Sequence, residues 1–310
     1  MHSPALLFAF VIVVVDVSAS SQTLQNILKN TDGSDKYGYP TDLTRNIVPK
    51  AMHSHNDYWR EVPFYSALSY GAVSIEADVW LINETLFVGH ELSALTPSRT
   101  LESLYIDPIL DTLHRQNPVT SFAPDKTLHG VYDAGSSQTL YLFIDLKTPG
   151  DTTWPVVLSA LEPLRRESYL STYDGTTFTE APVTVIGTGN TPLAAVQAAV
   201  PRDAFFDAPL ALLGTTFDNL TANDSPIAST SFEASFGEVR GRVFNDTQIE
   251  TLREQVKVAH EKGIKVRYWE QPLWPIGTRN AVWRTLWDEE ADLLNVDDLK
   301  GAAEFWEGSG

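Results

Sequence analysis

The chain has 310 residues, a formal net charge of −18 and no cysteine. This acidity argues against a nucleic acid as partner, because contact with a phosphate backbone requires clustered Lys and Arg. The lack of cysteine excludes disulfide bonds, zinc–thiolate sites and a cysteine nucleophile, so a large hydrophobic core has to stabilise the fold.

The N-terminus has the pattern of a secretory signal peptide. Residues 5–15 are all apolar, and Val17-Ser18-Ala19 offers the small residues that precede a cleavage site. Such a run is too short for a membrane-spanning helix, which needs roughly 20 residues, although an uncleaved anchor is the alternative. We predict a signal peptide at 1–19 and a secreted, extracellular glycoprotein, because four Asn-X-Ser/Thr sequons follow, at Asn83, Asn219, Asn223 and Asn245.

Residues 20–46 are polar and rich in turn-forming residues, and we expect them to form an N-terminal arm. From residue 47 to residue 310 strand-like and helix-like segments alternate within one domain. The predicted strands are 47–54, 74–80 with 86–90, 139–147, 183–188, 204–209, 227–232, 265–271 and 292–297. The predicted helices are 63–70, 100–116, 153–168, 191–200, 246–262 and 278–290.

Alternating strands and helices indicate parallel pairing through right-handed crossovers. Eight strands of this kind predict an α/β fold with a single (β/α)8 TIM-type barrel. An open doubly wound sheet is the competing architecture, but it is typically marked by a glycine-rich phosphate-binding turn after its first strand. The nearest match, Gly187-Thr188-Gly189-Asn190, is incomplete and lies in mid-chain, so we interpret it as a turn.

Acidic side chains lie at the predicted carboxyl ends of neighbouring strands. Glu76 and Asp78 alternate with apolar residues and therefore point to the same face of their strand. Two carboxylates so close repel each other unless a cation lies between them. Together with Asp145 and the amide of Asn56, they predict a site for one divalent cation, Mg²⁺ or Ca²⁺, which prefer such oxygen ligands.

Histidines flank these acids along the sequence. His53 lies near the end of the first strand, His55 follows that strand, and His90 ends the hairpin extension of the second. Two imidazoles beside a cation suit one proton abstraction and one proton donation. A single strand-end acid or histidine is most often structural, but several of them converging on one barrel mouth predict an enzyme.

Three segments resemble the core of the phospholipase C-like phosphodiesterase superfamily, which includes phosphatidylinositol-specific phospholipases C, glycerophosphodiester phosphodiesterases and sphingomyelinase D-type enzymes. They are His55-Asn56-Asp57-Tyr58, Ile75-Glu76-Ala77-Asp78-Val79-Trp80 and Gly89-His90. Ile144-Asp145-Leu146-Lys147-Thr148 is similar to a strand of the sphingomyelinase D branch. The segments 54–60, 76–80 and 294–299 look most like the fungal family named for altered inheritance of mitochondria, number six.

The resemblance implies a role for each residue of the motifs. His55 would be the general base and His90 the general acid, although an alignment on the sphingomyelinase D pattern puts His53 in place of His55. Glu76, Asp78, Asp145 and Asn56 would hold the cation, and Lys147 would steady a phosphate oxygen. The expected enzyme is a phosphoric diester hydrolase that acts on glycerophosphodiesters or phospholipid head groups.

Two further residues are candidates for substrate binding. Arg267 could grip a phosphate and Trp269 could stack on a head group, since both lie near the end of the seventh strand. We expect a monomer whose substrate is a small-molecule or lipid phosphodiester and whose contact with a membrane surface is transient. The alternatives are a non-catalytic barrel that binds a phosphorylated ligand through its cation pocket, and a metal-dependent hydrolase of another bond.

Overall fold

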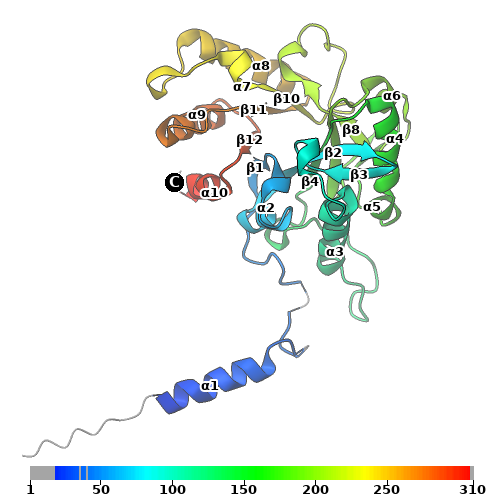
Figure 1. Cartoon of the computed structure of the whole chain (residues 1–310), viewed down its shortest axis with the longest axis vertical. Helices are drawn as coiled ribbons and strands as arrows, with labels where there is room; N and C mark the ends of the chain where they lie inside the picture. Colours follow the sequence, from blue (N-terminus) through cyan, green and yellow to red (C-terminus); the bar gives the residue numbers. More distant parts are fainter. Residues whose placement is uncertain (1–17, 35, 40, 308–310) are drawn as a thin grey trace, which may run out of the picture. The chain divides into compact units, whose positions relative to one another are not determined.

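The computed structural model describes residues 18–34, 36–39 and 41–307, and the chain divides into two units between residues 40 and 41. In the first unit, helix α1 (Ser18–Thr31) replaces part of the expected turn-rich arm (Figure 1). Leu24, Ile27 and Leu28 recur at the spacing of one helix face, a pattern that the polar residues around them concealed. The predicted signal peptide lies almost wholly outside the described residues.

The second unit is built around a nearly closed parallel sheet with helices outside it (Figure 1). Its hydrogen-bonded order is β8, β7, β4, β2, β1, β12, β11, β10 and β9. Asp207 alone separates β8 from β9, so the two act as one continuous strand of the barrel, here called a stave. This stave pairs with β7 through β8 and with β10 through β9. With this stave counted once, the barrel has the eight parallel members that the sequence predicted.

The strands have short, largely buried sequences, as expected for a barrel wall. Their bounds are β1 (Lys50–Ser54), β2 (Ala72–Ile82), β4 (Leu140–Leu146), β7 (Val183–Gly189), β8 (Ala204–Phe206), β9 (Ala208–Pro209), β10 (Ile227–Ser231), β11 (Lys265–Trp269) and β12 (Leu293–Val296). β3 (Thr85–Val88) pairs antiparallel with the end of β2. β5 (Thr172–Tyr173) and β6 (Phe178–Thr179) form a separate small hairpin.

Helices connect the staves, and most lie within the predicted segments. They are α2 (Tyr65–Tyr70), α3 (Asp107–Gln116), α4 (Gly150–Ala160), α5 (Glu162–Arg166), α6 (Leu193–Ala198), α7 (Phe232–Phe236), α8 (Asp246–Glu261), α9 (Ile276–Asp288) and α10 (Leu299–Glu307). The helix expected at 153–168 is two helices, because the chain breaks at Leu161 and Pro163 lies in the first turn of α5. Helices α7 and α10 were not predicted.

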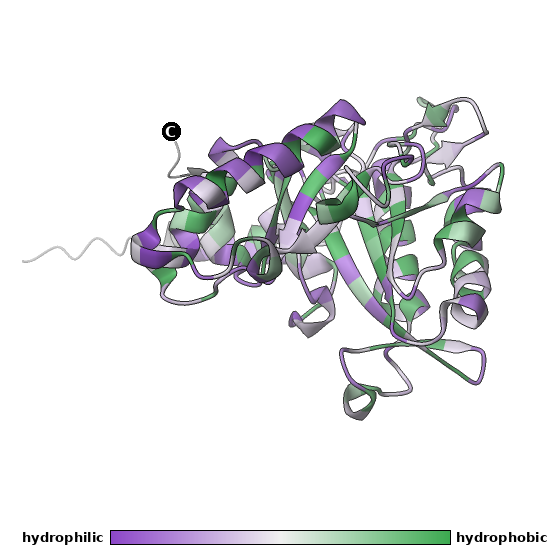
Figure 2. Cartoon of the chain, turned by 90° about the horizontal axis from the view of Figure 1, so that it is seen from above, coloured by the Kyte–Doolittle hydropathy of each residue, from purple (hydrophilic) through white to green (hydrophobic). Residues whose placement is uncertain are grey.

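The core of the second unit lies within the barrel and between the barrel and its helices. Figure 2 shows hydrophobic residues along the strands and hydrophilic residues concentrated on the outer helices. Among the described residues, no helix has the length and apolarity needed to cross a membrane.

Strand register brings the predicted acids together. In the pairing of β2 with β4, Asp78 lies opposite Asp145, and Glu76 lies opposite Phe143. The β2–β3 hairpin then returns the chain to the same place, since the amide of Gly89 donates to the carbonyl of Asp78 at 3.1 Å. His90 therefore follows directly beside the acids, at the carboxyl end of the barrel.

Candidate active site

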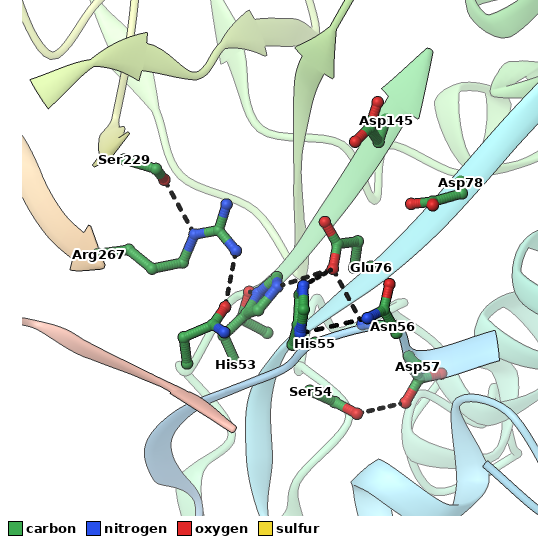
Figure 3. A network of polar contacts seen from close by, with 12 residues as sticks. His53, Ser54, His55, Asn56, Asp57, Glu76, Asp78, Asp145, Ser229 and Arg267 are labelled. Atoms are coloured by element: carbon green, nitrogen blue, oxygen red, sulfur yellow. Dashed lines mark hydrogen bonds and ion pairs between the residues drawn. The ribbon is translucent and has the colours of Figure 1, made fainter. Parts of the chain in front are cut away.

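The three predicted acids meet at the barrel mouth. Glu76, Asp78 and Asp145 each offer an oxygen atom, and these oxygens lie within 4.8 Å of one another (Figure 3). Asp78 is almost fully buried, and its Oδ1 atom has no hydrogen-bond partner among the described residues. A buried carboxylate oxygen without a partner is costly unless a ligand completes it, so this donor set fits a hard divalent cation.

The acids at this site differ in how readily they hold a proton. Burial and the charge of Glu76 raise the pKa of Asp78 to about 6, against the opposing charge of Lys147. Burial alone would also raise the pKa of Glu76, but a hydrogen bond from His53 and the neighbouring positive charges hold it below its ordinary range. Of these two acids, Glu76 is therefore the one that stays ionised more easily.

Lys147 lies between two of these acids. Its Nζ is 2.9 Å from Asp78 Oδ2 and 2.8 Å from Asp145 Oδ2. Burial lowers the pKa of Lys147, but the two carboxylates outweigh burial and raise it. The predicted phosphate-binding lysine is thus a fixed positive charge within the acid cluster.

Asn56 joins the site through an unusual backbone conformation. Its φ of 48° is left-handed, a region that Asn tolerates better than most residues. In this conformation its amide donates to Glu76 Oε2 at 3.0 Å, and its side-chain oxygen accepts from the Tyr58 hydroxyl. Asn56 therefore lies in direct contact with the acid cluster through its backbone amide.

His55 is paired with Asp297, the residue that follows the last strand of the barrel. Its Nδ1 is 2.9 Å from Asp297 Oδ1, at the end of β12, and its Nε2 is 3.9 Å from Glu76 Oε2. Burial lowers the pKa of His55, but the hydrogen bond to Asp297 and the charges of Glu76 and Asp297 outweigh it, and the net shift is upward. Only the neighbourhood of β1 and β12 in the barrel reveals this pair, because 242 residues separate its members.

His53, the alternative base, lies deeper in the barrel. It is fully buried, its Nδ1 is 2.7 Å from Ser74 Oγ, and its Nε2 is 3.5 Å from Glu76. Burial and the charge of Arg267 lower its pKa to about 3, so the ring is neutral. This position suits a residue that supports Glu76 rather than one that meets a substrate.

His90 lies on the other side of the acids and is 48% exposed. Its Nδ1 is 3.2 Å from Asp78 Oδ2 and 3.2 Å from the Tyr58 hydroxyl. The ring of Trp59 packs edge-on against it, with 5.4 Å between ring centroids. The two accessible histidines, His55 and His90, thus flank the acid cluster, and each has a carboxylate partner.

Arg267 does not reach the mouth, which corrects its predicted role in phosphate binding. It is 3% exposed, and its side chain donates to Ser229 Oγ and Asn295 Oδ1, each at 2.9 Å (Figure 3). Asp207 Oδ2 is 3.5 Å from its guanidinium, which also lies over the Phe143 ring. The residue lies in mid-strand and faces the barrel interior, where these partners satisfy its charge.

Trp269 ends β11 and is 39% exposed, as a substrate contact at the mouth would be. Beyond it, the loops after β10 and β11 enclose a cavity of about 540 Å³ lined by Glu270, Gln271 and Trp274. A smaller cavity of about 210 Å³ shares Gln271 and extends to Asp297. The smaller cavity therefore reaches the site at Asp297, the carboxylate that holds His55.

Several fungal proteins are similar to this chain over most of its length. A homologue of altered inheritance of mitochondria protein 6 from Arthroderma benhamiae is 52% identical over 300 residues, which cover 94% of both chains. The protein of that name from Eremothecium gossypii is 38% identical over 85% of this chain and 71% of its own length. The Saccharomyces cerevisiae protein is 33% identical over 83% of this chain and 71% of its own length.

The names of these relatives contradict the predicted localisation. All three are named for the inheritance of mitochondria, which associates them with that organelle and not with the extracellular space. The prediction of a secreted protein is therefore wrong. An apolar N-terminal run and scattered sequons also arise by composition alone, so together they do not establish secretion.

Two solved structures match this chain at low similarity. Both are glycerophosphodiester phosphodiesterases from Parabacteroides distasonis, with TM-scores of 0.46 and 0.47 and identities of 10% and 13%. They cover 85% and 87% of this chain, and the match covers 100% and 90% of theirs.

The family model described as an AIM6-like phosphodiesterase domain matches residues 41–207, which include all three acids and both accessible histidines of the site. The chain belongs to the AIM6-like phosphodiesterase family.

Proposed function

We propose that this protein hydrolyses phosphodiesters at the barrel mouth, with glycerophosphodiesters or phospholipid head groups as substrates. One observation carries the proposal. Three carboxylates meet within 4.8 Å, and His55 and His90 flank them with a carboxylate partner each. A site that only bound a phosphorylated ligand would gain little from two imidazoles held in this way.

Glu76, Asp78, Asp145 and Asn56 would hold one divalent cation, Mg²⁺ or Ca²⁺. Bound there, the ion would offset the negative charge that develops on the phosphoryl oxygens. The unpartnered Oδ1 of Asp78 supports this assignment. Lys147, held by Asp78 and Asp145, supplies a further positive charge for a phosphate oxygen.

The proposed reaction moves one proton at each histidine. His55 Nε2 takes the proton of the attacking oxygen, which then forms a bond to phosphorus while the bond to the leaving oxygen breaks. His90, protonated at both ring nitrogens before this step, gives its Nε2 proton to that leaving oxygen and keeps the proton on Nδ1. A substrate hydroxyl beside the phosphate yields a cyclic phosphodiester and an alcohol, whereas attack by water yields a phosphomonoester and an alcohol. Proton exchange with solvent then restores both histidines.

The test compares single variants of the site with a variant of an exposed histidine outside it. We expect Glu76→Ala and His90→Ala each to lower kcat by about 100-fold or more, because each removes charge stabilisation or proton transfer. His129→Ala, on an exposed loop, should retain the wild-type rate. The assay uses bis-p-nitrophenyl phosphate and glycerophosphocholine with Mg²⁺, Ca²⁺ or a chelator, and wild-type rates in either site variant would refute the assignment.

Thermal unfolding of the wild type separates this proposal from a binding barrel. A cation that binds the folded state raises Tm, and a chelator reverses the effect. Stabilisation by the cation together with turnover supports the hydrolase. Stabilisation without turnover of either substrate would favour the binding barrel, and no effect of either cation would remove the premise that both share.

A further inference from the structure

The hydroxyl of Tyr58 lies where three residues of the candidate site meet. It is 2.7 Å from Asp78 Oδ2 and 3.2 Å from His90 Nδ1, and it also contacts Asn56 Oδ1. The side chain is buried, with 2% of its surface exposed, and it comes from the short 3₁₀ turn η1 (Asp57–Trp59) after β1. Tyr58 therefore connects the first strand to the hairpin that carries His90.

The hydroxyl of Tyr58 can donate only one hydrogen bond. Where that proton goes determines whether the hydroxyl donates to His90 or accepts from it. A carboxylate and an amide oxygen only accept hydrogen bonds, so the proton of Tyr58 is directed to Asp78 or to Asn56. A lone pair of the hydroxyl oxygen then faces His90 Nδ1. The second neighbour of that nitrogen, Asp78 Oδ2 at 3.2 Å, is also an acceptor.

Two acceptors around one ring nitrogen settle the tautomer of neutral His90. Nδ1 carries the proton, and Nε2 is left with its lone pair. Asp78 alone is a weak determinant of this state, since its Oδ2 also accepts from Lys147 Nζ at 2.9 Å. The hydroxyl of Tyr58 has no such competitor for the lone pair that faces the imidazole.

We propose that Tyr58 is a positioning residue that keeps a proton on Nδ1 of His90, so that Nε2 is the nitrogen that gains and gives the catalytic proton, and that couples this orientation to the cation ligands Asn56 and Asp78. Outer partners of this kind fix the ring orientation and tautomer of functional histidines. The consequence for catalysis rests on the function proposed above. The tautomer itself does not, because it is a property of the resting protein.

The experiment compares Tyr58→Phe with Tyr132→Phe. Tyr132 is a suitable control because it is equally buried and its hydroxyl donates to a backbone oxygen, that of Ala72 at 2.7 Å, away from the site. Long-range ¹⁵N–¹H spectra of histidine-labelled protein report which ring nitrogen carries the proton, and loss of a signal in His90→Gln identifies His90. We expect the Nδ1–H form in the wild type and in Tyr132→Phe, and a mixture of tautomers in Tyr58→Phe.

The kinetic expectation is a loss of about 10- to 100-fold in kcat for Tyr58→Phe with KM unchanged, because binding is kept and proton transfer is misaligned. Wild-type His90 in the Nε2–H form would overturn the proposal, even if Tyr58→Phe failed to fold. So would a folded Tyr58→Phe that matched Tyr132→Phe in tautomer and in kcat. Absence of phosphodiesterase turnover in the wild type would refute the proposed function and leave the tautomer measurement valid.

Discussion

The two halves of the barrel contribute to the site in different ways. The first half, β1 to β7, supplies the acids, both accessible histidines and Lys147, all within short motifs at strand ends. The second half, β8 to β12, supplies partners that act through other residues: Asp297 holds His55, while Asp207 and Asn295 hold the buried Arg267. The reactive groups thus lie on the first half of the barrel, and the second half supplies residues that orient them and that place charge beside them.

Among the residues of the second half, Asp207 should give the largest measurable effect. The free energy that its burial costs the folded protein depends on pH. Burial, only partly offset by Arg267, raises its pKa from 3.8 to about 6. The folded protein therefore binds this proton more tightly than the unfolded chain, and the free energy of unfolding falls as pH rises from about 4 through 6. At about 1.4 kcal/mol per pKa unit, the ionised group costs on the order of 3 kcal/mol.

Asp207→Asn removes this titration. Denaturant unfolding of the wild type and the variant at a series of pH values measures the effect, and the difference between the two cancels groups that they share. We expect the wild type to lose about 3 kcal/mol relative to the variant between pH 4 and pH 7. A difference that does not vary with pH would show that the buried Arg267 balances Asp207 fully.

The same contrast explains how far the sequence could predict the molecule. Strand and helix periodicity sufficed for all eight staves, and the spacing of Glu76 and Asp78 along β2 sufficed for the acid cluster. The pair of His55 and Asp297 could not be predicted, since it depends on β1 and β12 closing the barrel. The inward direction of Arg267 was also hidden, because its neighbours Val266 and Tyr268 are both buried and do not show which face of the strand meets the barrel interior.

Asp297→Asn tests whether the second half orients a catalytic group. The amide keeps the shape of the side chain but loses the negative charge that selects the Nδ1–H form of His55, so we expect kcat to fall about 10- to 100-fold. Asp298→Asn is the matched control, because Asp298 adjoins it in sequence and instead binds Arg279 and the amide of Gly301. Equal activity of the two variants would mean that the contact between Asp297 and His55 has no role in turnover.

Trp269→Ala gives the smallest expected effect and asks whether the second half also contacts the substrate. An exposed aromatic ring contributes about 0.5–1 kcal/mol to binding a cationic head group, so KM for glycerophosphocholine should rise about two- to fivefold with kcat unchanged. Trp287→Ala is the control, since Trp287 is similarly exposed at 41% and lies near the carboxyl end of α9, which returns to the far end of the barrel. A change in kcat instead of KM would place Trp269 among the groups that orient the reaction, and the second half of the barrel would then have no demonstrated contact with substrate.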